Sequence, residues 1–250
     1  MRGQLSTCQF ENRTIQIYTP PSYLDDESAR FPAVIVQDGR YLFEGSIEAL
    51  EADFARGVTQ EVVFVGIEPI RRDVEYTPWE AEPLQEGECL GGEGDKYLSF
   101  VTEQVMPYVR ERYRVTEDPS QIGIAGGSFG GLISFYAAFR KPDHFGRFIL
   151  MSASLWYPNM LTFVENNAFA KNDIRLYMYV GEREGVGRAN LLGDMVPHTR
   201  KVYEMLKPKM PGGSGQVLLE MDPEGVHTHS YFNRYFPHGM RFVYPGPNAD

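Results

Sequence analysis

Seven short apolar runs, separated by longer polar and mixed segments, constrain the fold of this chain more than any other feature. Most of the runs are continuous and β-branched, which is typical of strands covered on both faces of a sheet. The segments between them are long enough for helices, so the pattern predicts βαβ units and an α/β fold with a mostly parallel sheet and helices on both faces. The runs are residues 14–19, 33–36, 62–67, 122–125, 148–151, 174–180 and 217–221, and the helix-sized segments are roughly 44–57, 94–112, 129–140, 192–208 and 229–243.

The pattern continues along the chain without a linker, an internal repeat or a low-complexity tract. We therefore expect one α/β domain over residues 1–250, a length that is ample for a sizeable core, with no large separate cap. The first run alternates apolar and polar residues and ends at two prolines, which predicts an edge strand. Residues 70–95 are rich in Pro, Gly and Glu and are predicted to form one long loop, of the kind that often makes a lid or a pocket rim.

The charge and the cysteine count exclude several classes of partner and compartment. A formal net charge of -10 argues against nucleic acid and anionic membranes as partners. No stretch approaches the run of about 18 apolar residues that a membrane span needs, and the first 30 residues have no apolar segment typical of a signal peptide. Two cysteines are too few for a disulfide framework, so we expect a cytoplasmic location. The oligomeric state is not indicated by the sequence.

A Gly126-x-Ser128-x-Gly130 motif lies where the apolar run 122–125 meets a helix-sized segment. A nucleophilic serine on a sharp strand-to-helix turn needs glycine two residues away on either side, because larger side chains would collide there. The helix that follows points its amino end at the site, where negative charge develops during acyl transfer. We expect Ser128 to be a catalytic nucleophile. The alternative is a glycine-rich turn that carries a surface serine.

A catalytic base is expected on a loop after a late strand, and His227 follows the run 217–221. Behind it, an amphipathic segment predicts an anchoring helix. His229 is the rival, two residues further along. The two histidines could also be interpreted as a metal site, but no further His or Cys clusters near them, so we expect no metal and favour His227 as the base.

The acid of a catalytic triad should follow the run 174–180, because in this fold the order along the chain is Ser, then Asp or Glu, then His. Its role is to accept the imidazole N–H and to stabilise the imidazolium that forms. Glu182, Glu184 and Asp194 follow that run, and Asp222 lies near the histidine loop. Each could instead be a solvated loop carboxylate. We favour Glu184 and leave the other three open.

An oxyanion hole requires two preorganised N–H donors, each worth about 3 kcal/mol of barrier. One is expected from the amide of Phe129, the residue after the nucleophile. The second is expected from the loop after the run 33–36, where Gly39 lets the backbone turn in closely, and we place it at Arg40 or its neighbour Tyr41. An ordinary Asp-Gly turn is the alternative explanation for this loop.

Substrate-binding residues are expected on the same rim. Trp156 and Tyr157 follow the run 148–151 and are predicted to form an aromatic wall that suits an acyl chain or an aryl ester, although such residues are as often packing. Arg71 and Arg72, in the predicted long loop, are candidates for binding an anionic substrate, with solvation as the common alternative. No organic cofactor is implied.

Taken together in order, these motifs resemble the esterase family that includes enterochelin esterases, siderophore trilactone hydrolases, feruloyl esterases and the mycolyltransferases. The resemblance covers nearly the whole chain. It depends on segments that are specific as an ordered set: Val36-Gln-Asp-Gly39, Val65-Gly-Ile with Arg71-Arg-Asp-Val-Glu-Tyr-Thr-Pro78, Gly91-Gly-Glu-Gly-Asp-Lys-Tyr-Leu-Ser-Phe100, Met106-Pro-Tyr-Val-Arg-Glu-Arg-Tyr-Arg114, Gly126-Gly-Ser-Phe-Gly-Gly131, Val180-Gly-Glu-Arg-Glu184 and Gly225-Val-His227.

The resemblance implies an α/β-hydrolase fold, with Ser128 as nucleophile, His227 as base, Glu184 as acid and the amide of Arg40 in the oxyanion hole. Two departures leave the substrate class open: the usual Gly-Gly-His is Gly-Val-His, and Phe232 stands where the family has Trp. The extra amino-terminal domain of the larger enterochelin esterases is also not expected here.

The predicted function is hydrolysis of a small-molecule carboxylic ester, such as a siderophore-type lactone or an aryl or acyl ester. An acyltransferase with the same triad and a catalytically silent binding protein of the same fold are the alternatives.

Overall fold

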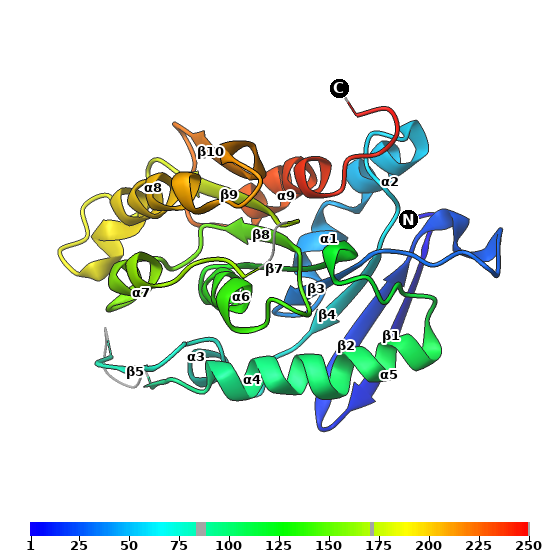
Figure 1. Cartoon of the computed structure of the whole chain (residues 1–250), viewed down its shortest axis with the longest axis horizontal. Helices are drawn as coiled ribbons and strands as arrows, with labels where there is room; N and C mark the ends of the chain where they lie inside the picture. Colours follow the sequence, from blue (N-terminus) through cyan, green and yellow to red (C-terminus); the bar gives the residue numbers. More distant parts are fainter. Residues whose placement is uncertain (84–88, 171–172, 250) are drawn as a thin grey trace.

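An eight-stranded sheet organises the chain in the computed structural model, which describes residues 1–83, 89–170 and 173–249 (Figure 1). The strand order is β1-β2-β4-β3-β7-β8-β9-β10. Six neighbouring strands, from β4 to β10 in that order, pair in parallel, whereas β1 with β2 and β2 with β4 pair antiparallel. The strands are β1 Gln4–Phe10, β2 Arg13–Thr19, β3 Ala33–Gln37, β4 Val63–Ile67, β7 Ile122–Gly127, β8 Arg147–Met151, β9 Arg175–Gly181 and β10 Val217–Asp222.

Helices cover both faces of this sheet, as the α/β pattern predicts. The helices are α1 Tyr41–Gly45, α2 Ile47–Arg56, α3 Arg72–Glu75, α4 Gly94–Phe100, α5 Met106–Arg112, α6 Phe129–Arg140, α7 Met160–Asn166, α8 Met195–Leu206 and α9 His229–Val243. The continuous apolar runs form the central strands because successive side chains point to opposite faces and both faces are buried. In β3, for example, Ile35 packs in one hydrophobic core and Val34 and Val36 in the other.

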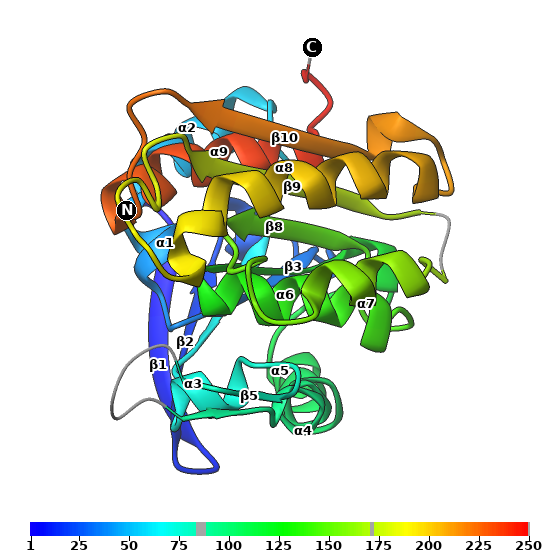
Figure 2. The ribbon, with the colours of Figure 1, turned by 90° about the vertical axis from the view of Figure 1, so that its left-hand side faces the viewer.

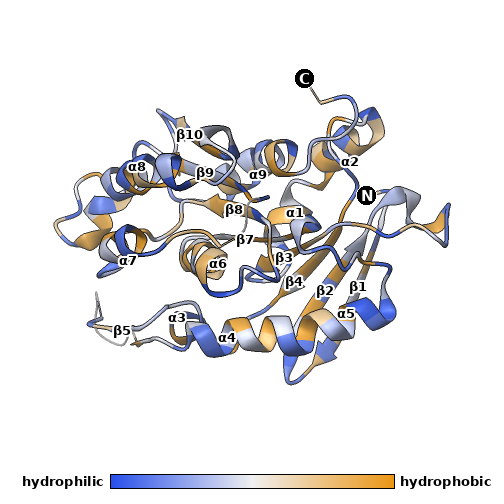
Figure 3. Cartoon of the chain, in the orientation of Figure 1, coloured by the Kyte–Doolittle hydropathy of each residue, from blue (hydrophilic) through white to orange (hydrophobic). Residues whose placement is uncertain are grey.

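The two cores are built from different helices. One contains side chains of α4, α5, α6, α7 and α8, and the other contains those of α1, α2 and α9. Hydrophobic residues accordingly concentrate along the central strands, whereas the helices show hydrophilic outer faces (Figure 3). The α9 helix begins at His229 and packs against β8 and β9, so the chain near the carboxyl terminus is held against the middle of the sheet.

Several details differ from the sequence-based expectations. The predicted edge strand is β2, which is an inner strand because β1 pairs along its full length. β1 was not predicted, since its side chains are largely exposed and carry little apolar signal. The helix α7 was also not predicted. The supposed long loop 70–95 contains α3 and a small two-stranded sheet, Glu80–Ala81 with Leu90–Gly91, while residues 84–88 of that loop lie outside the described residues.

The predicted helix 94–112 is present but is interrupted. One π-helical turn, Val101–Val105, separates α4 from α5. Pro107 lies in the first turn of α5 and has no N–H to donate to the preceding turn, so the hydrogen-bond ladder must change spacing there. The combined helix still buries Leu98, Val105 and Val109 against the sheet.

Candidate active site

Ser128 occupies a strained turn between β7 and α6. Its backbone has φ 57° and ψ -121°, a conformation that non-glycine residues rarely adopt and that structures retain mainly at functional sites. The turn is also tight: a Cβ on Gly126 would lie 2.4 Å from the carbonyl carbon of Gly130, and one on Gly130 would lie 2.9 Å from Cβ of Gln37. Glycine is therefore required on both sides of Ser128, as the motif predicts.

The imidazole of His227 is held by a buried carboxylate. Nδ1 of His227 lies 2.6 Å from Oε2 of Glu184, in the range of a short charge-assisted hydrogen bond. The Glu184 side chain is 1% exposed, whereas that of His227 is 38% exposed. This pair leaves the other ring nitrogen, Nε2, available to a reactant, which is the orientation a catalytic base needs.

Two further donors fix the Glu184 carboxylate. The Ser152 hydroxyl donates to Oε1 at 2.5 Å and the Gly181 amide donates to the same oxygen at 2.9 Å. Because both oxygens are bonded, burial of this charge is compensated. Ser152 itself is fully buried and has φ 46°, and its amide donates to Tyr179 at the end of β9.

The other candidate acids are engaged elsewhere. Glu182 pairs with Arg200 at 2.9 Å, and Asp194 lies at the N-cap of α8. Asp222 accepts hydrogen bonds from the Tyr235 hydroxyl and the Glu224 amide, both at 2.8 Å. The first of these bonds is the largest cause that lowers the pKa of Asp222 below its usual range. Of the four carboxylates considered from the sequence, the structure brings only Glu184 to His227.

Ser128 and His227 lie on the walls of two shared cavities but are not hydrogen-bonded to one another. Instead, Oγ of Ser128 lies 3.4 Å from Oγ of Ser154, a buried residue after β8. That separation is long for a bond between hydroxyls, so it constrains the serine side chain weakly. Catalytic hydrogen bonds are often long or unformed until substrate binds.

The smaller of these cavities, here called the Trp156 cavity, has a volume of about 270 Å³. Its lining combines an apolar wall with the two reactive groups and one arginine. The lining residues are Ser128, Ser154, Trp156, Glu184, Gly185, Arg188, Leu192, Met195 and His227. Trp156 was expected on the rim beside Ser128, and the structure places it there, 3% exposed and packed on the ring of Phe129.

The larger, here called the Arg72 cavity, has a volume of about 410 Å³ and a more polar lining. It is lined by Asp38, Tyr41, Arg72, Gly127, Ser128, His227, His229 and Phe232. His229, the rival base, lies here with its ring 4.3 Å from that of Tyr41, and it makes no contact with a carboxylate among the residues that the structure describes. The two histidines of the motif therefore have different surroundings.

Arg72 reaches this cavity as expected, but its charge is already paired. Nε and Nη2 donate to the two carboxylate oxygens of Asp38 at 2.7 and 2.9 Å, a bidentate arrangement. The guanidinium also lies near the rings of Tyr76 and Phe129. Burial opposes its charged form, but the hydrogen bonds and charge of Asp38 outweigh burial and raise the pKa of Arg72.

Tyr157 does not line the substrate wall, which corrects the expectation from sequence. Its side chain is 1% exposed, its hydroxyl donates to the carbonyl of Trp79, and its ring packs against Phe129. Position after a strand indicates which edge of the sheet a residue reaches, but not whether its side chain turns toward the cavity or into the core. Tyr157 therefore supports the wall from behind.

The two predicted oxyanion residues differ in their placement. Phe129 is the first residue of α6, directly after Ser128, so its amide lies at the amino end of that helix. Arg40 precedes α1, its side chain pairs with Glu44 at 3.0 Å, and it does not line either cavity, whereas its neighbour Tyr41 lines the Arg72 cavity. The structure thus brings Tyr41, the alternative position for the second donor, to the cavity that Ser128 lines.

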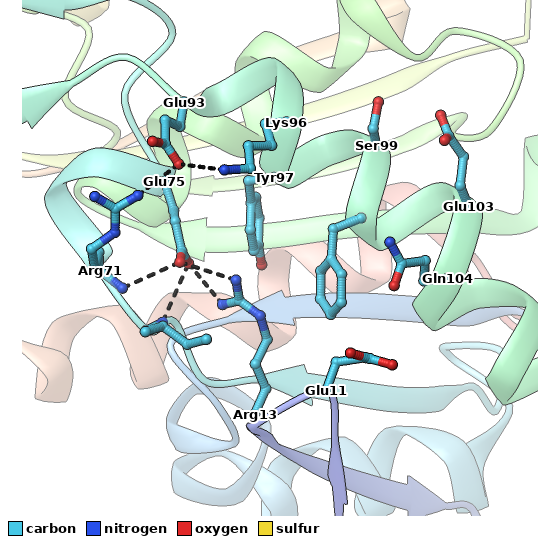
Figure 4. A pocket seen from close by; sticks show the side chains of 12 residues that line it. Glu11, Arg13, Arg71, Glu75, Glu93, Lys96, Tyr97, Ser99, Glu103 and Gln104 are labelled. Atoms are coloured by element: carbon cyan, nitrogen blue, oxygen red, sulfur yellow. Dashed lines mark hydrogen bonds and ion pairs between the residues drawn. The ribbon is translucent and has the colours of Figure 1, made fainter.

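Another hollow, of about 500 Å³, lies apart from Ser128 and takes up Arg71 (Figure 4). Arg71 pairs there with Glu93 at 2.8 Å, while Arg13 and Glu75 face one another in a bidentate pair. Its central charges are therefore satisfied within the protein. Arg71, considered with Arg72 as a binder of anionic substrate, lines this hollow and neither of the cavities beside Ser128.

Sequence reasoning missed Ser152, Ser154, Asp38 and Arg188. The two serines directly follow β8, and Arg188 lies in the loop after β9, so the rule that chemistry gathers after the carboxyl ends of strands could have singled them out. Their contacts could not have been found, because the partners are distant in sequence.

Among the described residues, no group of three or more His, Cys, Asp or Glu side chains gathers in a way that could hold a metal ion. No helix in the described part of the chain combines the length and the apolar character needed to cross a bilayer.

The parallel sheet, the strained serine after β7 and the histidine after β10 define an esterase of the α/β-hydrolase fold. The family model described as "Putative esterase" matches residues 8–243, and the chain belongs to that family. Family membership confirms the resemblance inferred from the motifs.

Individual relatives support the same assignment. The chain is 38% identical to the uncharacterized protein YbbA of Bacillus subtilis over 245 residues. This alignment covers 98% of this chain and 97% of that protein. It is 30% identical over 155 residues to the iron(III) enterobactin esterase of Dickeya dadantii, covering 61% of this chain but only 32% of that protein. An IroE-like serine hydrolase from Shewanella oneidensis has the same fold, with a TM-score of 0.79 and 20% identity over 97% of this chain and 80% of that one.

Proposed function

We propose that the protein hydrolyses small-molecule carboxylic esters through an acyl-enzyme on Ser128, with His227 as general base and Glu184 as the triad acid. The observation that carries the proposal is the short bond from His227 to the buried Glu184 carboxylate, on the walls of cavities that a strained serine also lines. In such an arrangement the imidazole activates the serine hydroxyl as a nucleophile, and the carboxylate stabilises the positive charge that forms on the imidazole.

The reaction begins when the Ser128 hydroxyl turns from Ser154 toward His227. Nε2 of His227 takes the hydroxyl proton as Oγ attacks the carbonyl carbon, and Glu184 stabilises the imidazolium. The oxyanion is held by the amide of Phe129 and by an amide of the loop at Arg40 and Tyr41. The imidazolium then protonates the leaving alcohol, and a water activated by the same imidazole hydrolyses the acyl-enzyme.

The two cavities support an ester with bulk on both sides of the scissile bond. The indole of Trp156 with Leu192 and Met195 offers an apolar surface on one side, and the Arg72 cavity offers polar groups on the other. Siderophore-type lactones and aryl or acyl esters fit this description, and the relative from Dickeya dadantii is an iron(III) enterobactin esterase. We also propose a cytoplasmic location, on the two free cysteines of the sequence.

A fluorophosphonate probe tests the nucleophile directly, because it reacts with activated serines without needing the natural substrate. We expect labelling of the wild-type protein and none of the Ser128→Ala variant, with Ser154→Ala still labelled as a matched control. A folded wild-type protein that stays unlabelled would overturn the proposal and favour a binding protein of the same fold.

A panel of esters then identifies the substrate class. The panel contains a siderophore lactone, a cinnamoyl ester, an acetylated sugar and a short acyl ester, compared by kcat/KM. Repeating the assay with an acceptor alcohol distinguishes hydrolysis from acyl transfer, since a transferase forms a new ester in place of the free acid.

A further inference from the structure

Arg188 is a cation without a counter-charge in the Trp156 cavity. It lies in the segment that joins β9 to α8 (Figure 2). Within the described ranges its guanidinium has no hydrogen bond, ion pair or ring contact. Other arginines around it are paired: Arg183 with Glu224, and Arg200 with Glu182. The Arg188 side chain is exposed on the cavity wall, so its charge is open to a ligand.

No free carboxylate in the cavity is available to neutralise Arg188. Glu184 is the acidic residue that lines it, but the Glu184 side chain is 1% exposed and both its oxygens are engaged by His227, Ser152 and the Gly181 amide. The remaining lining side chains are neutral or apolar, apart from the imidazole of His227. A guanidinium beside an apolar wall binds planar oxygen anions in a bidentate manner, because its fork of donors matches their geometry.

The surroundings of the cavity indicate a ligand larger than the cavity itself. A volume of about 270 Å³ is at or below the lower end for small-molecule pockets. Three exposed apolar side chains flank its lining residues in sequence: Val186 is 77% exposed, and Leu191 and Val226 are each 36% exposed. A bulky substrate that extends from the cavity over these neighbouring residues would cover their apolar surface.

We propose that Arg188 determines substrate specificity, and that the Trp156 cavity takes a part of the ester that carries a carboxylate on an apolar or aromatic body. The inference rests on the proposed function, because it assigns the anion to one side of the ester cleaved at Ser128. It narrows the proposed substrates from carboxylic esters in general to esters that carry a negative charge.

The test compares phenyl benzoates that differ in the charge of one para substituent, and reads the change in their relative kcat/KM between protein variants. One series carries a para carboxylate, carboxamide or trimethylammonium group on the acyl ring, and the mirror series carries the same groups on the phenol ring. In wild-type protein, kcat/KM for the carboxylate should exceed that for the carboxamide in one of the two series. Arg188→Gln should lower that ratio about tenfold, and Arg188→Glu should reverse the order of the carboxylate and the trimethylammonium esters.

The matched control is Lys201→Gln, which removes the same charge from an exposed position on α8 outside the cavities. It should leave the ratio at its wild-type value, so a general effect of net charge is separated from a local one. If both glutamine variants change the ratio equally, or if Arg188→Gln leaves it unchanged in both series, the assignment of Arg188 is wrong.

Binding to the Ser128→Ala protein tests Arg188 without turnover. The Kd for the para-carboxylate ester should rise about tenfold when Arg188→Gln is added to Ser128→Ala, and less than twofold for the carboxamide. An equal Kd with and without Arg188 overturns the inference. Failure of the proposed function has a different signature, since wild-type protein would then hydrolyse no ester of either series whatever the result of these binding measurements.

Discussion

The Trp156 cavity and the Arg72 cavity share Ser128 and His227 but hold their arginines in opposite ways. Arg72 is bonded to both oxygens of Asp38 and lies near two aromatic rings, so its direction and charge are settled by the protein. Arg188 has no partner among the described residues and is exposed. One wall of the site is thus preorganised and nearly neutral, whereas the other presents a charge that a ligand can pair. The difference indicates that shape and fixed polar groups select the part of the ester in the Arg72 cavity, whereas charge selects the part in the Trp156 cavity.

The carboxylate of Glu184, which holds the His227 ring common to both cavities, should give the largest effect. Glu184→Gln keeps the shape but removes the charge that stabilises the imidazolium and orients the ring, so we expect kcat to fall by about 10³ to 10⁴ for esters of any charge. Steady-state kinetics on the carboxamide ester measures it, with Glu182→Gln as the control. An effect confined to anionic esters would mean that Glu184 serves one cavity instead of both.

Ser152→Ala should have the next largest effect. It removes the hydroxyl bond to Glu184 and leaves a buried carboxylate oxygen with the Gly181 amide alone. A hydrogen bond to a charged group is worth about 1.5–3 kcal/mol, so kcat should fall roughly 10- to 100-fold. KM should stay nearly constant, because Ser152 does not line either cavity. A rise in KM with unchanged kcat would contradict a positioning role.

Asp38→Asn should leave an unpaired arginine in the Arg72 cavity, as Arg188 is in the Trp156 cavity. The substitution leaves Arg72 without its counter-charge, so the preference for a carboxylate ester over the carboxamide ester should rise about threefold, as expected for a half-exposed charge. Asp73→Asn is the matched control, since its carboxylate lies 4.0 Å from the same guanidinium. If Asp38→Asn lowers the preference instead, Arg72 does not face the substrate.

The smallest effect is expected from Asp222, at the start of the loop that carries His227. It should appear as a pH dependence of the free energy of unfolding. Hydrogen bonds from Tyr235 and the Glu224 amide lower the pKa of Asp222 below its reference value of 3.8. A carboxylate whose pKa is depressed in the folded state stabilises the protein above that reference value, and this stabilisation is lost as the pH falls through the folded-state pKa.

The difference in urea midpoint between wild type and Asp222→Asn should therefore be largest near pH 7 and shrink below pH 3.8. Asp25→Asn, at an exposed position, serves as the control. Burial and the bond to Asp222 raise the pKa of Tyr235 to about 12, so this hydroxyl remains a donor across the whole range. A constant difference from pH 7 to pH 3 would show that the Asp222 charge contributes nothing.

The sequence was sufficient for the sheet and for the residues placed after its strands. Six continuous apolar runs predicted strands because burial on both faces leaves a strong apolar signal, and an alternating run predicted β2, whereas the exposed β1 left no such signal. Strand ends and chain order singled out Ser128 and His227, but they left four candidate acids, and Glu184 is the one whose contact with His227 the structure shows. The direction in which Tyr157 faces, and the pairing of Arg72 with Asp38, depend on contacts between distant segments, which no local pattern encodes.

The position of His227 after β10, the last strand of the sheet, has a consequence for biosynthesis. In a nascent chain, Ser128 is synthesised about a hundred residues before His227, and α9, the helix that anchors this histidine, follows later still. Until translation has passed α9, the emerging polypeptide holds a serine without its base. On the proposed mechanism, a product truncated before His227 carries Ser128 without its base and is expected to hydrolyse no ester.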